Sequence, residues 1–203
     1  MEMNIEYLPE SHTYLVNGVI TPSTTQIIRK LKPDKYKGIP ASVLKTAAQY
    51  GDIVHEAIEE IGQGRDILFR EKSYEGIAIR RFRELKVYHE LDIISVEQPV
   101  AYMDKDEPLF AGRYDMVGTV RGEWAVIDIK TTSKYDREYL EIQLSMYVMA
   151  LQQKGLQVDK AYCLWLPKKA LGTLLEVDIR RPEELLPEIR KAKEAILTEW
   201  QID

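Results

Sequence analysis

An aspartate and a lysine, Asp128 and Lys130, stand two positions apart where an apolar segment of the sequence ends. The segment 123–130 reads as a β-strand, and side chains two positions apart emerge on the same face of a strand. A carboxylate and an ammonium group are therefore expected side by side at a strand end, which is where ligands gather in sheets covered by helices. An incidental ion pair at a fraying strand gives the same pattern, so this triplet alone does not establish a function.

A second carboxylate, Asp115, lies inside an otherwise apolar strand predicted over 109–120. A buried carboxylate must be paired or bound to a cation, because burying it alone is too costly. A tight turn at 121–122 favours a hairpin of the two strands, although the sequence does not determine its register. In a suitable register Asp115 faces Asp128 and Lys130. Two carboxylates beside a lysine form an oxygen-rich site suited to Mg²⁺ or Mn²⁺.

Two helices contribute further polar residues. His55 lies at the edge of the apolar stripe of a helix predicted over 41–62, where it can face a packing layer or a cleft. Gln143 and Tyr147 are four positions apart on a helix predicted over 136–154, and hence lie on one face of it. Taken alone, a core-edge histidine and an ordinary amphipathic helix explain these features equally well.

In this order, the features resemble the PD-(D/E)XK nuclease superfamily, and within it the RecB-type nucleases and related phage exonucleases. That pattern is a helix histidine, a Gly-x-x-Asp strand, an Asp-x-Lys strand end and a Gln-x-x-x-Tyr helix. The matching residues are His55, Gly112 with Asp115, Asp128 with Lys130, and Gln143 with Tyr147. The stretch from His12 to Ser23 also looks like phage-borne members. One departure is Tyr114, which stands where the superfamily name implies a proline; the RecB-type branch tolerates this change.

The resemblance implies a set of metal ligands. Asp115 and Asp128 would hold Mg²⁺ or Mn²⁺, with His55 and the backbone carbonyl of Ile129 completing the protein ligands. Such a metal ion polarises the scissile phosphate and lowers the pKa of a bound water. Lys130 would orient that water or neutralise the charge that develops on phosphorus.

The resemblance also suggests supporting roles around this centre. Gln143 and Tyr147 would position the DNA strand and brace the site. Glu97 fits a carboxylate that some relatives carry on the preceding strand and could position a second metal ion or a water, but a solvated strand residue explains it as well. Thr131 and Thr132 could contact phosphate and are equally ordinary loop residues.

The resulting hypothesis is a metal-dependent DNA exonuclease that acts on double-stranded ends or single strands in phage recombination or DNA repair. An endonuclease of the same fold is one alternative. A nuclease-fold protein that binds DNA or a partner without cutting is another, although such proteins usually lack a ligand or the lysine. A partner in single-strand annealing or recombination is compatible with the first hypothesis. The single cysteine, Cys163, excludes a four-cysteine iron–sulfur cluster, and the sequence contains no phosphate-binding Gly-x-x-x-x-Gly-Lys-Ser/Thr loop.

The composition is that of a globular protein, with 203 residues of which 45% are hydrophobic and 30% charged. We expect a single domain over 1–203, made of an N-terminal hairpin and helices (1–90), a catalytic core (about 91–180) and a C-terminal helix (182–201). No apolar run approaches the roughly 20 residues of a membrane span, and the N-terminus does not resemble a signal peptide. These features and the single cysteine predict that the protein is located in the cytoplasm of a bacterium, encoded by the bacterium, by a prophage or by an infecting phage.

The formal net charge is −5, so DNA binding would depend on local basic patches. One candidate patch lies within 29–37 and consists of Arg29, Lys30, Lys32, Lys35 and Lys37, with Tyr36 among them. A second would lie beside the site and consists of Arg113, Lys134 and Arg137. Contacts of this kind bind phosphates without regard to sequence. A solvated charged loop explains the segment 29–37 equally well.

Periodicity and turn residues predict the order of elements. Helices are expected over about 22–31, 41–62, 74–89, 136–154 and 182–200, the first with Thr21 as its cap and Pro22 as its first residue. Strands are expected over 5–7, 13–16, 93–102, 109–120, 123–130, 158–166 and 173–177. The order predicts an α/β (α+β) fold with one central mixed β-sheet flanked by helices on both faces, as in restriction endonucleases.

Overall fold

The computed structural model describes residues 3–33 and 40–201. In this part of the chain the helices are α1 (Thr24–Leu31), α2 (Ala41–Gly62), α3 (Tyr74–Tyr88), α4 (Arg137–Gln153) and α5 (Pro182–Trp200). The strands are β1 (Ile5–Leu8), β2 (Thr13–Val16), β3 (Val19–Thr21), β4 (Leu91–Asp104), β5 (Glu107–Val120), β6 (Glu123–Lys130), β7 (Lys160–Trp165) and β8 (Thr173–Glu176). Every element lies close to its predicted range except β3, which the sequence does not predict.

The main sheet has five strands in the order β4-β5-β6-β7-β8. β6 and β7 run parallel, and α4 connects them, because parallel neighbours need a long crossover. The other neighbouring strands are antiparallel. Arg121 and Gly122, with φ of 52° and 81°, form the tight turn between β5 and β6. The predicted mixed sheet is confirmed.

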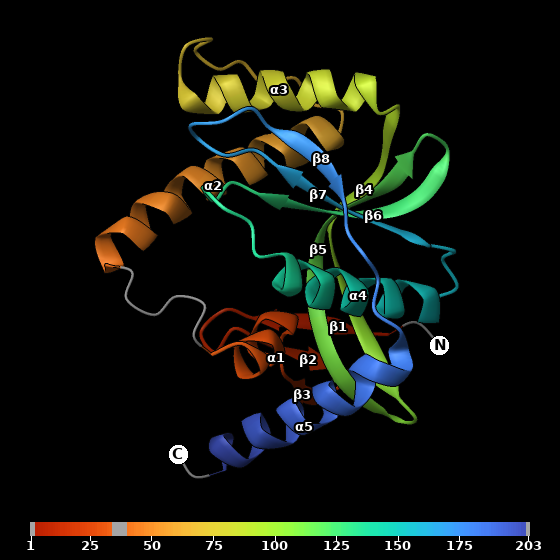
Figure 1. Cartoon of the computed structure of the whole chain (residues 1–203). Coiled ribbons are helices and arrows are strands. Elements are labelled where there is room, and N and C mark those ends of the chain that lie inside the picture. The colour runs from red at the N-terminus through yellow and green to blue at the C-terminus, as the bar shows by residue number, and fades with distance from the viewer. Residues whose placement is uncertain (1–2, 34–39, 202–203) are drawn as a thin grey trace.

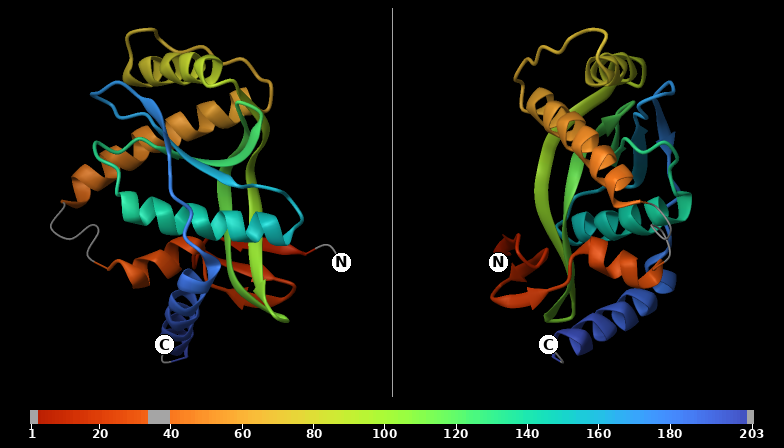
Figure 2. Two further views of the ribbon diagram at one scale, coloured as in Figure 1. Left: turned by 45° about the vertical axis from the view of Figure 1, so that its right-hand side comes forward. Right: turned by 90° about the vertical axis from the view of Figure 1, so that its left-hand side faces the viewer.

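Helices cover both faces of the main sheet, as predicted (Figures 1 and 2). On one face Ile58 of α2 and Phe82 of α3 join Ile127 of β6 in one apolar core. On the other face α4 packs through Leu144 in a core that contains Val126 and residues of α1 and α5. From Ala125 to Ile127, β6 is therefore buried and apolar on both faces, and the polar side chains of the site begin at Asp128.

A separate antiparallel sheet of β1, β2 and β3 precedes α1. The dipeptide Asn17-Gly18 joins β2 to β3 with φ of 50° and 84°, the left-handed conformation that an Asn-Gly hairpin turn requires. The sequence prediction missed β3 because this strand is only three residues long and its first two residues, Val19 and Ile20, are exposed. Neither its length nor a buried face distinguishes it from a loop.

The first helix begins at Thr24, two residues later than predicted. The carbonyl of Pro22 accepts a hydrogen bond from the backbone N–H of Ala111 on β5 (3.1 Å), which keeps this residue in an extended connection. Ser23 caps the helix instead: its Oγ accepts from the N–H of Gln26 (3.2 Å), and Gln26 Oε1 accepts from the N–H of Ser23 (2.8 Å). The start of α1 is thereby fixed beside the middle of β5.

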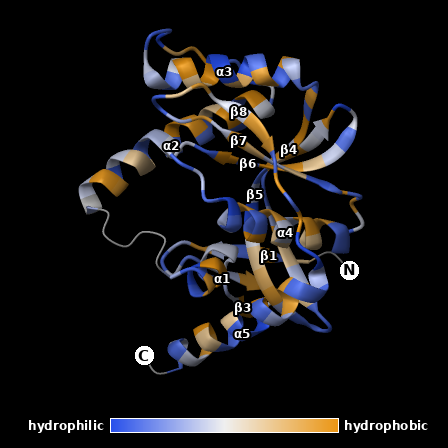
Figure 3. Cartoon of the chain, in the orientation of Figure 1, coloured by the Kyte–Doolittle hydropathy of each residue, from blue (hydrophilic) through white to orange (hydrophobic). Residues whose placement is uncertain are grey.

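Hydrophobic and hydrophilic residues alternate along the outer helices in Figure 3, as expected for helices with one face packed and the other in water. Helix α4 differs, because nearly all of its residues from Tyr139 to Leu151 are buried. In α5 the buried residues recur every three or four positions, at Leu185, Ile189, Ala192 and Ile196. Within residues 3–33 and 40–201 no helix is both long and apolar enough to cross a membrane.

Candidate active site

Three carboxylates form a row across neighbouring strands of the main sheet. The register of β4 and β5 places Glu97 opposite Asp115. The register of β5 and β6, in which Met116 faces Ile127, places Asp128 at the next position along the row. The sequence left this register open, and the structure adopts one in which the two aspartates are neighbours. We call Glu97, Asp115 and Asp128 the acidic row.

Helix α2 carries His55 to the acidic row. Its Nδ1 lies 3.7 Å from Oδ2 of Asp115, and its Nε2 lies 3.0 Å from the backbone carbonyl oxygen of Ile129. A carbonyl only accepts hydrogen bonds, so Nε2 carries the proton and Nδ1 of the neutral imidazole has a free lone pair. A histidine whose second nitrogen donates to a backbone carbonyl is the usual arrangement around a metal ion.

The ligand atoms of His55, Glu97 and Asp115 all lie within 4.8 Å of one another. The carboxylate of Asp115 is held by the backbone N–H of Ile129, which donates to its Oδ2 at 2.6 Å. Two carboxylate oxygens and one imidazole nitrogen fit Mg²⁺ or Mn²⁺, because Mg²⁺ keeps several waters and needs few protein ligands. The imidazole favours Mn²⁺ of the two.

Glu97 has an unusual backbone conformation. Its φ is 51°, in the left-handed region that non-glycine residues rarely adopt, and such strain gathers at functional sites. Burial, followed by repulsion from Asp115, raises the pKa of Glu97 to about 7, although Arg113 lies 2.7 Å away and opposes the shift. A cation between two carboxylates relieves such repulsion, so this shift fits a metal-binding group.

Asp128 and Lys130 form a buried ion pair, as their shared strand face predicts. Their Oδ2 and Nζ atoms are 2.5 Å apart, and the side chains are 2% and 22% exposed. Burial alone would lower the pKa of Lys130, but the carboxylates of Asp128 and Asp115 outweigh it and raise the pKa. Lys130 is therefore an ammonium group at neutral pH, which can stabilise negative charge but cannot accept a proton.

The grouping of ligand atoms differs from the predicted set of Asp115, Asp128, His55 and the Ile129 carbonyl. Glu97 joins Asp115 and His55, and Asp128 is not one of the three whose ligand atoms lie within 4.8 Å. Asp128 remains beside them, since the charges of Asp115 and His55 act on it. Apart from the ion pair with the neighbouring lysine, its buried Oδ2 has no hydrogen-bond partner among the described residues, and it fits a cation ligand. The Ile129 carbonyl faces His55.

Helix α4 places Gln143 and Tyr147 next to the acidic row. Both are buried, and burial raises the pKa of Tyr147 well above its usual value while Gln143 opposes the shift. The glycine of the Gly-x-x-Asp pattern has a steric reason. A Cβ at Gly112 would lie 2.5 Å from Oγ1 of Thr24 and 2.8 Å from Cε1 of Tyr147, so only glycine lets β5, α1 and α4 approach this closely.

An open cavity of about 810 Å³ adjoins the acidic row, and we call it the active-site cavity. Thr131 and Thr132 line it, together with residues of α1, α2, β4 and β5. Gly51 of α2 lies close to Thr131, since a Cβ there would be 3.1 Å from its Oγ1. Phosphate contacts by the two threonines stay a prediction.

The basic segment 29–37 is divided by its ion pairs. Lys32 pairs with Glu138 of α4, so its charge is already partly neutralised. Lys35 and Lys37 lie outside the described residues. Arg29 lines the active-site cavity and has no acidic partner in the described parts of the chain. Of the predicted strip, Arg29 is therefore the residue that the structure places at the site.

The second predicted patch is also divided. Arg113 lines the active-site cavity, beside the carboxylate that it pairs with. Arg137, on the first turn of α4, pairs with Glu141 at 3.0 Å and also with Asp178. Neither Arg137 nor Lys134 is among the described residues that line the active-site cavity. The three residues therefore do not form one continuous patch at the site.

A sequence model of the PD-(D/E)XK nuclease superfamily matches residues 66–202, which is more than half of the chain. The chain belongs to the PD-(D/E)XK nuclease superfamily. Its members are nucleases that use divalent metal ions, and the mixed sheet with flanking helices is the core expected of them. His55 and the small N-terminal sheet precede the matched range.

Solved structures similar to this chain include SSO0001, with 17% identity and a TM-score of 0.49 over 87% of this chain and 74% of that one. They also include LHK-Exo, an alkaline exonuclease from Laribacter hongkongensis, with 10% identity and a TM-score of 0.46 over 90% of this chain and 88% of that one. LHK-Exo in complex with dAMP has 15% identity and a TM-score of 0.44 over the same shares. No match was found among curated proteins.

Sequence reasoning assigned no role to the side chains of the small N-terminal sheet. Tyr7, His12 and Tyr14 nevertheless line a second cavity, which shares Glu97 and Arg113 with the active-site cavity. The sequence carries a weak signal for it, namely aromatic residues in a hairpin just before a basic helix. Nothing in that pattern shows that the hairpin folds back against β5.

Proposed function

We propose that the protein is a metal-dependent deoxyribonuclease that hydrolyses phosphodiester bonds from DNA ends. The observation that carries the proposal is the acidic row, with His55 against its middle and Lys130 paired at its end. This arrangement sets cation ligands next to a fixed ammonium group beside an open cavity. Phosphodiester hydrolysis needs this combination, since negative charge develops on the phosphate as the nucleophile attacks.

His55, Glu97 and Asp115 would hold Mg²⁺ or Mn²⁺, and Asp128 would reach it from the next strand. When bound, the cation polarises the phosphate and lowers the pKa of a coordinated water, so that the water can attack at neutral pH. The main chain of Ile129 holds two of these ligands, its N–H on Asp115 and its carbonyl on His55. The ligands are thus oriented before a cation arrives.

Lys130 would stabilise the charge that develops on the phosphate oxygens. Its ammonium group is held by Asp128 and keeps its proton at neutral pH, so it acts as a donor throughout the reaction. Removing one such donor typically costs about 100- to 1,000-fold in rate. Tyr147 and Gln143 would support the row from α4 and help to position the strand.

The proposed substrate is DNA, which would be held by local charge in spite of the net charge of −5. Arg29 and Arg113 line the active-site cavity and could contact the phosphates on either side of the cleaved bond. The motif resemblance to RecB-type nucleases and phage exonucleases favours an exonuclease that processes DNA ends in phage recombination or DNA repair.

The test uses three forms of one DNA sequence: an end-labelled linear duplex, the single strand and a closed circle. Each is incubated with Mg²⁺, Mn²⁺ or excess chelator and followed over time. We expect the linear forms to shorten progressively from their ends with either metal and the circle to stay intact. Cutting of the circle would identify an endonuclease instead, and no metal-dependent cleavage of any form would contradict the proposal.

Two aspartate variants separate the acidic row from general charge effects. Asp115→Asn keeps the size of the side chain and an oxygen that can accept from the N–H of Ile129, but it removes the charge, so cleavage should be lost while the protein stays folded. Asp106→Asn removes the same charge from an exposed residue in the turn between β4 and β5. This matched control should cleave as the unmodified protein does.

A further inference from the structure

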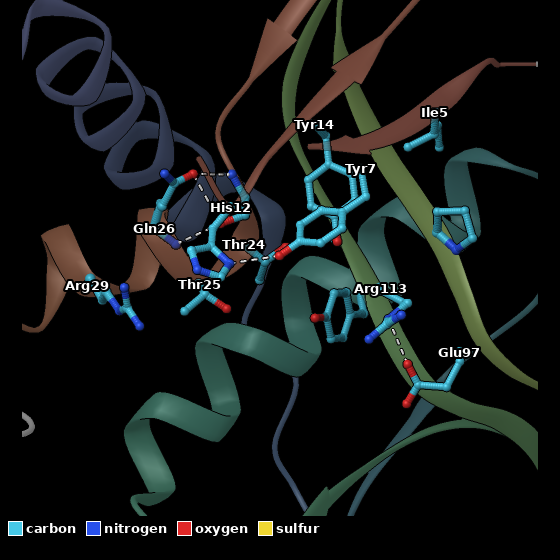
Figure 4. Close-up of a pocket in the computed structure, with 14 residues that line it drawn as sticks. Ile5, Tyr7, His12, Tyr14, Thr24, Thr25, Gln26, Arg29, Glu97 and Arg113 are labelled. Atoms are coloured by element: carbon cyan, nitrogen blue, oxygen red, sulfur yellow. Dashed lines mark hydrogen bonds and ion pairs between the residues drawn. The ribbon is translucent and has the colours of Figure 1, made fainter. Parts of the chain in front are cut away.

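A second cavity of about 510 Å³ adjoins the active-site cavity on the side of the small N-terminal sheet, and we call it the hairpin cavity. Arg29, Glu97 and Arg113 line both cavities. Figure 4 shows Tyr7 and Tyr14 of the small sheet in one space with residues of α1 and β5. Glu97 belongs to the acidic row, so an occupant of the hairpin cavity would lie directly beside the reacting phosphate.

Tyr7 presents an aromatic ring to the hairpin cavity and is held in place there. The residue is 45% exposed, and its hydroxyl lies 2.7 Å from Nδ1 of His12. Its ring centroid is 5.1 Å from that of Tyr14, which is buried. An exposed tyrosine usually loses rotational freedom when a ligand packs on it. Here the hydrogen bond and the neighbouring ring have already ordered the side chain.

His12 is the last residue of the turn that joins β1 to β2. Its φ is 53°, a left-handed conformation that histidine adopts more readily than most non-glycine residues. Among the described residues, the hydrogen bond to the Tyr7 hydroxyl is the only one that the His12 side chain makes. The turn between β1 and β2 thus places the His12 ring where it holds the Tyr7 hydroxyl.

Cationic and hydroxyl groups of α1 and β5 complete the walls. Arg29 of α1 and Arg113 of β5 bring guanidinium groups to the same cavity as the tyrosine rings, and Thr25 adds an exposed hydroxyl (Figure 4). Aromatic rings that stack on bases, next to cations that follow the phosphates, are the means by which proteins bind single-stranded nucleic acid. The volume is also in the range of small-ligand sites, about 300–1,000 Å³.

We propose that the hairpin cavity binds the unpaired base of the nucleotide next to the scissile phosphate, with Tyr7 stacked on the base and Arg29 beside its phosphate. The inference rests on the proposed function, because it takes the acidic row as the site of cleavage. A base inside a duplex is stacked on both faces and cannot lie flat on Tyr7, and a terminal base must leave its partner to enter the hairpin cavity. The substrate at this site is therefore a single strand or an unpaired end, bound with little sequence preference.

The first experiment measures the binding of labelled single-stranded oligonucleotides by fluorescence anisotropy. Ca²⁺ replaces Mg²⁺, and each oligonucleotide is checked to be intact afterwards. Loss of one stacked base predicts about 5- to 150-fold weaker binding for Tyr7→Ala. Tyr7→Phe keeps the ring and should stay within about threefold of the unmodified protein. The matched control is Tyr88→Ala, at an exposed tyrosine on α3 that lines neither cavity, and it should bind normally.

The second experiment uses oligonucleotides that each lack one base at a different position. In the unmodified protein, one abasic position next to the cleaved bond should weaken binding by the same factor as Tyr7→Ala. Combining that oligonucleotide with Tyr7→Ala should cause no further loss of affinity, since both changes delete the same contact between Tyr7 and the base. A blunt duplex should bind more weakly than the single strand, and Tyr7→Ala should reduce that difference.

Several results would overturn the inference. One is equal binding by Tyr7→Ala and Tyr88→Ala, and another is additive losses from Tyr7→Ala and every abasic position. Free dAMP that binds as tightly as the oligonucleotide would show a mononucleotide site rather than a strand site. If Tyr7→Ala melts at a lower temperature, Tyr7→Leu replaces it, since leucine is apolar and has no π-face. Failure of the proposed function would look different: no variant would cleave DNA, whereas the binding series would still be readable.

Discussion

Replacing Gly112 with alanine tests the close packing beneath the acidic row. The added Cβ would lie 2.5 Å from Oγ1 of Thr24 and 2.8 Å from Cε1 of Tyr147, well inside the roughly 3.5 Å of an ordinary contact. Both neighbours are buried, at 1% and 5% exposure. Thr24 also donates a hydrogen bond from Oγ1 to the carbonyl of Ala111 at 3.1 Å. Neither side chain can turn away without losing contacts.

The expected cost is that of an overpacked core, about 1–3 kcal/mol. A chain of this length loses roughly 2–4 °C of melting temperature per kcal/mol, so Gly112→Ala should melt about 2–12 °C lower. Tyr147 would also be displaced, and DNA cleavage should fall by more than the loss of folded protein explains. Differential scanning fluorimetry and a cleavage assay on the same samples measure both effects.

Gly51→Ala is the matched control, because its Cβ would meet a single side-chain atom, Oγ1 of Thr131 at 3.1 Å. Gly51 lies inside α2, where alanine is favoured over glycine by about 1 kcal/mol, so this variant should be as stable as the original or more so. Adding Thr24→Ala to Gly112→Ala should recover part of the lost stability. A Gly112→Ala protein that melts at or above the original temperature would refute the packing argument.

Three further predictions concern charge at the site. The pKa of Glu97 is raised to about 7 in the folded protein, so protonation of its carboxylate favours the metal-free folded state. This contribution to stability is complete below about pH 4.5 and is lost as pH rises through about 7. Calorimetry should accordingly show Mn²⁺ affinity increasing up to about pH 7, and Glu97→Gln should weaken this dependence. Arg29→Ala should reduce the slope of log affinity against log salt by about 0.7–0.9, whereas Lys32→Ala, whose charge already pairs with Glu138, should leave it unchanged. His55→Ala should raise the Mn²⁺ concentration for half-maximal cleavage; a lower melting temperature with an unchanged midpoint would indicate a packing role instead.

The sequence predicts well those features of the site that depend on local periodicity. The two-residue period of a strand is enough to place Asp128 and Lys130 side by side, and they form the expected ion pair. The four-residue spacing of Gln143 and Tyr147 places both on one face of α4, beside the acidic row. The mixed sheet and its two helical layers follow from the order of predicted elements, because a strand–helix–strand unit gives parallel neighbours and tight turns give antiparallel ones.

Features that depend on distant residues are less accessible to sequence reasoning. The role of Glu97 stays open in the sequence, because its place opposite Asp115 and its left-handed φ depend on the register of two long strands. The pairing of Lys32 with Glu138 joins residues far apart in the chain, and no local pattern indicates it. The hairpin cavity is missed for the same reason, since it forms only when the N-terminal sheet docks on β5.

The central claim is that His55, Glu97 and Asp115 hold the divalent cation that DNA cleavage requires. Its most direct test is to measure Mn²⁺ binding by calorimetry and DNA cleavage on the same preparations of three proteins: the original, Asp115→Asn and Asp106→Asn. We predict that the original and Asp106→Asn bind Mn²⁺ and cleave DNA equally well, and that Asp115→Asn loses both properties while keeping its melting temperature. Cleavage by the original protein in excess chelator, or unchanged Mn²⁺ binding by Asp115→Asn, would contradict the claim.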